Sequence, residues 1–186
     1  KMNEFKAKVM YKSKGKAPNG EPFMTIKKAR GYYEYSERPG KDSIAFILYD
    51  KTTNKIGLIN ESKPPMDERE NKLVRMTTAF GGSVDMDKTN QEICQIEVIE
   101  ESGYEVPLEK IISVGKTMVS TQSSQMMEGF VVDITGIEKT HLTEFEKKEN
   151  SEFEGNSVVW MTLEEVIENS DWKSIFIISK KSFMER

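Results

Sequence analysis

Three glutamates lie close together in one short stretch of the chain, at Glu97, Glu100 and Glu101. In an α-helix, steps of three and four residues return to the same face, so a helix here would bring the three carboxylates together. Like charges at these spacings repel, and residues 90–102 contain no lysine or arginine to neutralise them. The pattern fits a solvated acidic helix face, and it fits equally a site for a divalent cation.

The residues on either side of the glutamates carry strong helix signals. Thr89 and Glu92 form a capping box, and Gly103 is a C-terminal stop, so the sequence predicts a helix over residues 90–102. A predicted strand over 72–79 runs into a glycine pair just before this helix. A strand, a glycine-rich loop and a capped helix bring backbone groups and carboxylates to one place, which favours the metal site.

The remaining segments predict a sheet with few helices. Residues 44–49 are apolar on both faces, which indicates a central strand, and residues 60–71 are expected to form a polar loop. Further strands are expected at 5–11, 23–36, 56–59, 111–118, 127–134 and 157–161, and two helices at the end of the chain, one opened by a capping box at 162–165 and one over 171–183. Without regular alternation of strands and helices, this order predicts an α+β fold: a mixed sheet covered by helices, in a single domain.

The composition limits which metal ligands, partners and classes of protein are expected. The chain has 186 residues, of which 37% are hydrophobic and 31% charged, and no run approaches the roughly 20 apolar residues of a membrane span. A single cysteine, Cys94, and a single histidine, His141, leave oxygen as the expected metal ligand, which selects Mg²⁺ or Mn²⁺. The net charge of −4 argues against general nucleic-acid binding, and a cytoplasmic location is expected.

Residues 82–104 resemble the Nudix box, which reads Gly, five residues, Glu, seven residues, then Arg-Glu-apolar-x-Glu-Glu-x-Gly-apolar. The matching positions are Gly82, Glu97, Val98, Glu100, Glu101, Gly103 and Tyr104. Lys88 stands where the family has its first glutamate, and Ile96 stands where it has arginine. Both members of the family's bracing ion pair are therefore replaced together.

The resemblance implies a Nudix-type α/β/α sandwich with a mixed sheet, a β-rich N-terminal extension over 1–40 and a core over 41–186. It also implies a metal-dependent pyrophosphohydrolase. Glu97 and Glu101 would be the main ligands of Mg²⁺ or Mn²⁺, Glu100 would assist, and a backbone carbonyl at Gly81 or Gly82 would add another oxygen.

The flanking segments are similar to the ADP-ribose pyrophosphatase branch of that family. The branch places a catalytic base in a late loop before a Val-Val-Trp strand, which makes Glu152 or Glu154 the candidate here. Lys63 lies where the branch often has a substrate-binding arginine. The branch also suggests a homodimer formed through the N-terminal strands. The proline that ADP-ribose hydrolases have beyond the box is absent here.

Three other residues are candidates for substrate contacts. Tyr32 and Tyr33 could stack on a nucleobase, although strand aromatics more often pack in a core or at a dimer contact. Gln125 ends a polar segment that could hydrogen-bond a ligand or simply form a loop.

Three functions follow from these features. The first is hydrolysis of a nucleoside diphosphate linked to another moiety, such as ADP-ribose or a nucleotide sugar. The second is a decapping or NADH-type activity on a larger nucleotide. The third is a Nudix-fold binding or regulatory module with little or no catalysis, which the residues at Lys88 and Ile96 favour.

Overall fold

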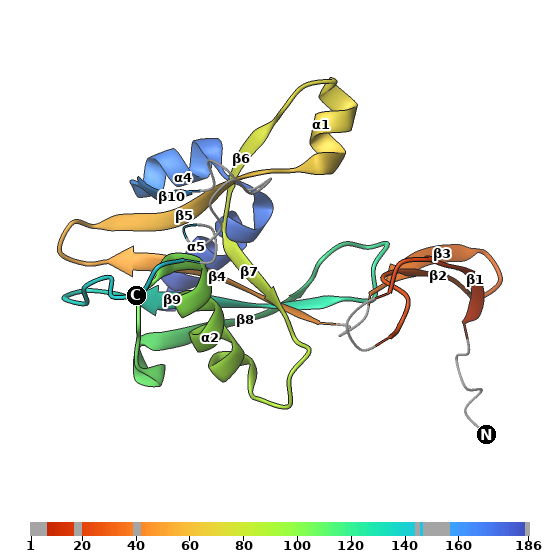
Figure 1. The fold of residues 1–186 in the computed structure, drawn as a ribbon, viewed down its shortest axis with the longest axis horizontal. Helices are drawn as coiled ribbons and strands as arrows, with labels where there is room; N and C mark the ends of the chain where they lie inside the picture. The colour runs from red at the N-terminus through yellow and green to blue at the C-terminus, as the bar shows by residue number, and fades with distance from the viewer. Residues whose placement is uncertain (1–6, 17–19, 39–41, 144–145, 147–156, 185–186) are drawn as a thin grey trace. The chain divides into compact units, whose positions relative to one another are not determined.

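The computed structural model describes residues 7–16, 20–38, 42–143, 146 and 157–184 (Figure 1). Internal contacts divide the chain into two compact units. The first unit comprises Lys1–Ser43, Ser83–Asp87 and Lys116–Met127, and the second comprises Ile44–Gly82, Lys88–Gly115 and Glu128–Arg186. The first unit therefore contains the expected N-terminal extension and two later segments. That the chain is one domain stays a prediction.

The first unit contains an antiparallel sheet of three strands in the order β1 (Lys8–Lys12), β2 (Thr25–Ala29) and β3 (Tyr33–Glu37). The prediction of one extended segment over 23–36 was wrong, because a hairpin turn separates β2 from β3. Arg30 and Gly31 both have positive φ, 50° and 79°, and the N–H of Tyr32 donates to the carbonyl of Ala29, which closes a tight turn between the two antiparallel strands.

A second sheet contains seven strands among the described residues. Its main path among the described residues is β10 (Ser157–Met161), β5 (Lys55–Ser62), β4 (Ser43–Asp50), β9 (Met126–Asp133) and β8 (Ile111–Met118), with β6 (Arg75–Thr78) on β5 and β7 (Phe80–Ser83) on β4. Residues 44–48 of β4 are all buried, as expected for a central strand that is apolar on both faces. The rings of Phe46 and Phe80 stack at 4.9 Å and hold β7 against β4.

The three predicted helices are present, and two further helices were not predicted. They are α2 (Asn90–Ser102), α4 (Leu163–Asn169) and α5 (Trp172–Met184), as expected, and also α1 (Pro64–Glu70) and the short 3-10 helix η1 (Leu108–Lys110). The prediction of a loop over 60–71 was wrong, because β5 continues to Ser62 and α1 follows it. Two prolines begin α1, where their missing N–H groups cost no helix bond, and Asp67 bonds the backbone of Val74.

Contacts of two neighbouring residues in β9 show how the helices cover the sheet. Asn90 of α2 bonds the carboxylate of Glu128 at 2.7 Å, whereas Ile177 of α5 packs closely over Gly129. Successive residues of a strand point to opposite faces, so the sheet lies between α2 and α5. The fold is an α+β sandwich with a mixed sheet, which confirms the predicted fold class. No helix in the described ranges combines the length and the apolar character needed to cross a bilayer.

Candidate functional site

Helix α2 is fixed at both ends and along one side. Thr89 and Glu92 form the predicted capping box, and Gly103 ends the helix with φ of 79°. The side-chain amide of Gln91 donates to the carbonyls of Leu108 and Ile111, both at 2.8 Å. Since these bonds hold the helix to the segment that follows it, the glutamates of α2 have defined positions.

The first of these glutamates lies against the glycine pair of β7. A Cβ atom at position 82 would overlap the carboxyl group of Glu97, so only glycine leaves room for this side chain. Gly82 and Glu97 are therefore in direct contact, as the sequence predicted when it placed the loop and the carboxylates together.

Glu101 lies beside Glu97 and is largely buried. Burial, and next the negative charge of Glu97, raise the pKa of Glu101 to about 8, although a backbone hydrogen bond from Gly81 opposes the shift. Its Oε2 atom is buried and has no hydrogen-bond partner among the described residues. A buried carboxylate oxygen without a partner is costly, so this atom needs a proton or a cation.

The third predicted ligand is placed differently, because Glu100 is exposed on α2. Among the described residues, no three His, Cys, Asp or Glu side chains are arranged as a ready cluster of metal ligands. The residues that fit a hard divalent cation are therefore Glu97 and Glu101, with backbone oxygens of the glycine pair beside them. The orphaned oxygen of Glu101 and the all-oxygen donors agree with Mg²⁺ or Mn²⁺.

The charge of a further carboxylate, that of Glu61, acts on Glu101. Glu61, near the end of β5, also raises the pKa of Glu101 through its charge, whereas Lys173 on α5 lowers it. Glu61 forms an ion pair with Lys63, the lysine that the sequence offered as a substrate contact. Lys63 is thus connected to the charges around Glu101 through Glu61, which the sequence did not single out.

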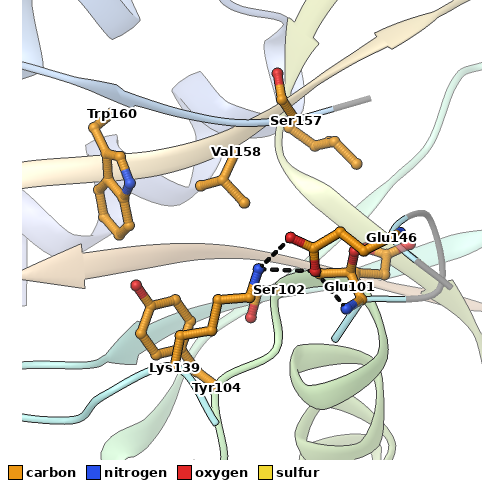
Figure 2. Close-up of a pocket in the computed structure, with 10 residues that line it drawn as sticks. Glu101, Ser102, Tyr104, Lys139, Glu146, Ser157, Val158 and Trp160 are labelled. Atoms are coloured by element: carbon orange, nitrogen blue, oxygen red, sulfur yellow. Dashed lines mark hydrogen bonds and ion pairs between the residues drawn. The ribbon is translucent and has the colours of Figure 1, made fainter. Parts of the chain in front are cut away.

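Glu101 also lines a pocket of about 300 Å³ in the second unit. Its other lining residues are Ile59, Ser102, Tyr104, Lys139, Thr143, Glu146, Ser157, Val158 and Trp160. Figure 2 shows the rings of Tyr104 and Trp160 on one side of the pocket and the carboxyl groups of Glu101 and Glu146 on the other. Tyr104 and Trp160 also line a second pocket of about 510 Å³.

Register between β10 and β5 explains the apolar wall of the first pocket. Val158 pairs with Ile59 and Trp160 with Gly57, so Val158 and Trp160 share one face of the sheet. A Cβ atom at position 57 would overlap the six-membered ring of Trp160. Gly57 therefore allows the indole to lie close over the neighbouring strand.

The polar wall is built around Lys139. Its Nζ atom donates to both carboxylate oxygens of Glu146, at 2.7 and 2.9 Å, and these bonds together with the backbone N–H of Thr143 lower the pKa of Glu146 to about 2. The carbonyl of Gly103 accepts the backbone N–H groups of Thr140 and His141, both at 3.1 Å. The glycine that ends α2 thus also holds the segment that carries Lys139.

The chain shares its fold with a solved ADP compounds hydrolase. The two agree with a TM-score of 0.61 over 100% of this chain and 95% of the ADP compounds hydrolase, at 13% sequence identity. At this identity the likeness to the ADP compounds hydrolase shows the fold alone. No protein-family model matches the sequence, and no curated protein does.

The remaining predicted residues that the structure describes are not among those that line the pocket. Tyr32, Tyr33 and Gln125 belong to the first unit. Tyr32 is 71% exposed and Gln125 is 9% exposed, while the hydroxyl of Tyr33 donates to the carbonyl of Thr121. Their role in substrate binding stays a prediction. The two candidates for the catalytic base, Glu152 and Glu154, lie outside the described residues.

Apart from Glu101, the sequence did not single out the residues on the polar side of the pocket. Thr143 and Glu146 hydrogen-bond each other's backbone in the Thr-x-x-Glu pattern of a capping box, and this spacing could have drawn attention to them. No local signal connects Lys139 to Glu101, because their proximity depends on the backbone bonds at Gly103.

Proposed function

We propose that this protein is a metal-dependent hydrolase of a nucleoside diphosphate linked to another moiety, such as ADP-ribose or a nucleotide sugar. The products would be a nucleoside monophosphate and a phosphorylated second product. The shared fold with an ADP compounds hydrolase supports hydrolysis of an ADP-type compound. The Nudix-like spacing of Gly82, Glu97, Glu101 and Gly103 supports the metal dependence.

One observation carries the proposal more than any other. The buried Oε2 atom of Glu101 lacks a hydrogen-bond partner among the described residues, next to a second carboxylate and at the edge of a pocket. Such an arrangement costs stability in the free protein, which is typical of groups that act on a ligand. A solvated acidic face would leave all three glutamates exposed, and Glu101 is not.

The residues of the chain have separate roles in this reaction. Glu97, held beside Gly82, and Glu101, held by the N–H of Gly81, would bind Mg²⁺ or Mn²⁺, with a backbone carbonyl of the glycine pair. The bound cation supplies positive charge for the diphosphate and acidifies water. Glu97 and Glu101 are held by backbone contacts and so keep their orientation when substrate arrives. Glu152 or Glu154 is the proposed base.

The direct test is Mg²⁺-dependent release of AMP from ADP-ribose, measured on the intact chain and on Glu101→Gln. We expect turnover by the intact chain and a loss of about 100-fold or more in the variant, since a charged ligand is removed. Equal turnover by both proteins would place the metal elsewhere. A panel of nucleotide sugars, NADH and capped RNA extends the test to the decapping and NADH-type alternative.

A binding or regulatory module is the alternative from another class. Lys88 and Ile96 favour it, because the glutamate and arginine of the Nudix pattern are both absent at these positions. Binding of ADP-ribose without turnover of any compound in the panel would support the module over the enzyme.

A further inference from the structure

The pocket beside Glu101 has an aromatic side and a polar side, and neither the sequence nor the likeness to known proteins gives it a ligand. Aromatic rings line one side, a lysine ammonium lies in the polar wall, and the buried carboxyl group of Glu101 is at the edge. We propose that this pocket binds the nucleoside monophosphate part of the substrate, with the base against Trp160 and Tyr104 and the phosphate against Lys139. This inference rests on the proposed function.

The aromatic wall suits a nucleobase. Trp160 and Tyr104 are both half-buried, so each is held by the protein and still contributes surface to the pocket. The indole of Trp160 is fixed over Gly57, and Val158 adds an aliphatic surface on the same face of β10. Flat, fixed rings of this kind stack on bases with little loss of side-chain freedom.

Lys139 suits a phosphate. Its ammonium carries three donors and has no other cation beside it in the pocket lining, while its bonds to Glu146 lie at a half-exposed site where water screens ion pairs. A phosphate dianion can therefore share or replace Glu146 as the partner of Lys139.

The position of Glu101 sets the direction of the ligand. The base side of the pocket is formed by Trp160 and Tyr104, and the carboxyl groups lie opposite (Figure 2). A nucleoside monophosphate in this pocket would point its phosphate toward Glu101, where the proposed cation binds. The volume of about 300 Å³ is at the small end for ligand pockets, which agrees with one half of a dinucleotide rather than the whole molecule.

The test uses the fluorescence of Trp160. The chain has two tryptophans, and Trp172→Phe leaves Trp160 as the single reporter. AMP, adenosine and ribose 5-phosphate are titrated with Mg²⁺ present, since AMP has no anhydride to cleave. We expect AMP and adenosine to quench Trp160, and ribose 5-phosphate to compete with AMP without quenching. Calorimetric titration of AMP into the unmodified chain repeats the measurement if Trp172→Phe folds poorly.

Variants of Lys139 separate the phosphate contact from the fold. Lys139→Ala should weaken AMP binding by about tenfold or more and adenosine binding by less than about twofold, because only AMP carries the charge. Lys139→Arg should keep AMP binding, and Lys180→Ala, an exposed lysine of α5 outside the pocket lining, is the matched control. No quenching by AMP, or an equal loss for AMP and adenosine in Lys139→Ala, would overturn the proposal.

The two proposals fail in different ways. If the protein hydrolysed ADP-ribose and AMP had no effect on the fluorescence of Trp160, the hydrolase function would be supported and the nucleotide-binding role of the pocket would be rejected. Quenching that depends on Lys139 in a chain that hydrolyses nothing would keep the pocket and make the protein a nucleotide-binding module.

Discussion

The carboxyl group of Glu97 lies in the space that a side chain at Gly82 would fill. This contact joins the strand β7 to the helix α2 at the point where two carboxylates meet. Because Glu97 reaches this place only beside a glycine, the residue at position 82 controls where one proposed metal ligand points.

Gly82→Ala should therefore displace Glu97 while leaving the fold intact, because the overlapping atoms belong to the flexible end of its side chain. We expect Mn²⁺ affinity, measured by calorimetry, and ADP-ribose turnover each to fall by about tenfold or more. Gly81→Ala is the matched control, since a Cβ atom there would meet only the carbonyl of Ile44 at 3.4 Å and the N–H that bonds Glu101 is kept. Equal losses in the two variants would mean that the Gly82 contact is not specific.

The pKa of Glu101 gives a prediction about pH. Its pKa is raised from the ordinary 4.5 to about 8, so between these values the folded protein holds a proton that the unfolded chain has released. Stability of the metal-free protein should fall as pH rises from about 4.5 to 8 and then level off. Glu101→Gln should remove this dependence and raise the melting temperature by several degrees at pH 8, measured in EDTA. A constant difference between the two proteins from pH 5 to 8 would show that Glu101 titrates normally.

Metal binding should stabilise the protein through the same two carboxylates. A ligand at about 100 times its Kd adds about 2.7 kcal/mol to the stability of the folded state. We expect Mg²⁺ or Mn²⁺ to raise the melting temperature of the intact chain by several degrees and to have little effect on Glu97→Gln or Glu101→Gln. Glu100→Gln should keep most of the effect, because Glu100 is exposed. If Glu100→Gln abolished it, the exposed glutamate would be a principal ligand.

The lowered pKa of Asp133, at the end of β9, leads to a prediction about the stability of the protein in acid. Although burial raises its pKa, hydrogen bonds from Lys51 and Thr135 outweigh burial and lower the pKa from 3.8 to about 2. Its contribution to stability is therefore present above pH 4 and is lost as pH falls toward 2. Asp133→Asn should make acid unfolding between pH 4 and 2 less steep, as followed by circular dichroism. Glu138→Gln, a change at an exposed carboxylate, should leave the curve unchanged.

The sequence predicted best what local signals determine. Helix α2 begins and ends where its capping box and Gly103 placed it, because these residues satisfy the helix ends through neighbours in sequence. Helix α1 was missed, since it has no buried residue to give an apolar pattern and its two prolines read as loop residues. The turn at Arg30 and Gly31 was missed because it lacks the Asn-Gly or Asp-Gly pair that usually marks such a turn.

In the candidate site too, the residues that share local spacing were predicted, whereas those brought together by the fold were not. Helical spacing placed Glu97 and Glu101 together, but the same spacing included Glu100, which burial alone distinguishes from them. The place of Lys139 in the polar wall of the pocket could not be predicted from spacing. Lys139 is brought near Glu101 by backbone hydrogen bonds between residues far apart in sequence, and no residue type records such bonds.

Gly103 links the helix that carries Glu101 to the segment that carries Lys139. Its positive φ ends the helix that carries Glu101, and its carbonyl binds the segment that carries Lys139, so one peptide unit joins the two sides. The main-chain hydrogen bonds at Gly103 therefore set how far the backbone of Lys139 lies from the end of the helix that carries Glu101. Substitution of Trp160 or Tyr104 would change which chemical groups the pocket accepts. The main-chain link between the segments that carry Glu101 and Lys139 would remain as long as residue 103 is glycine.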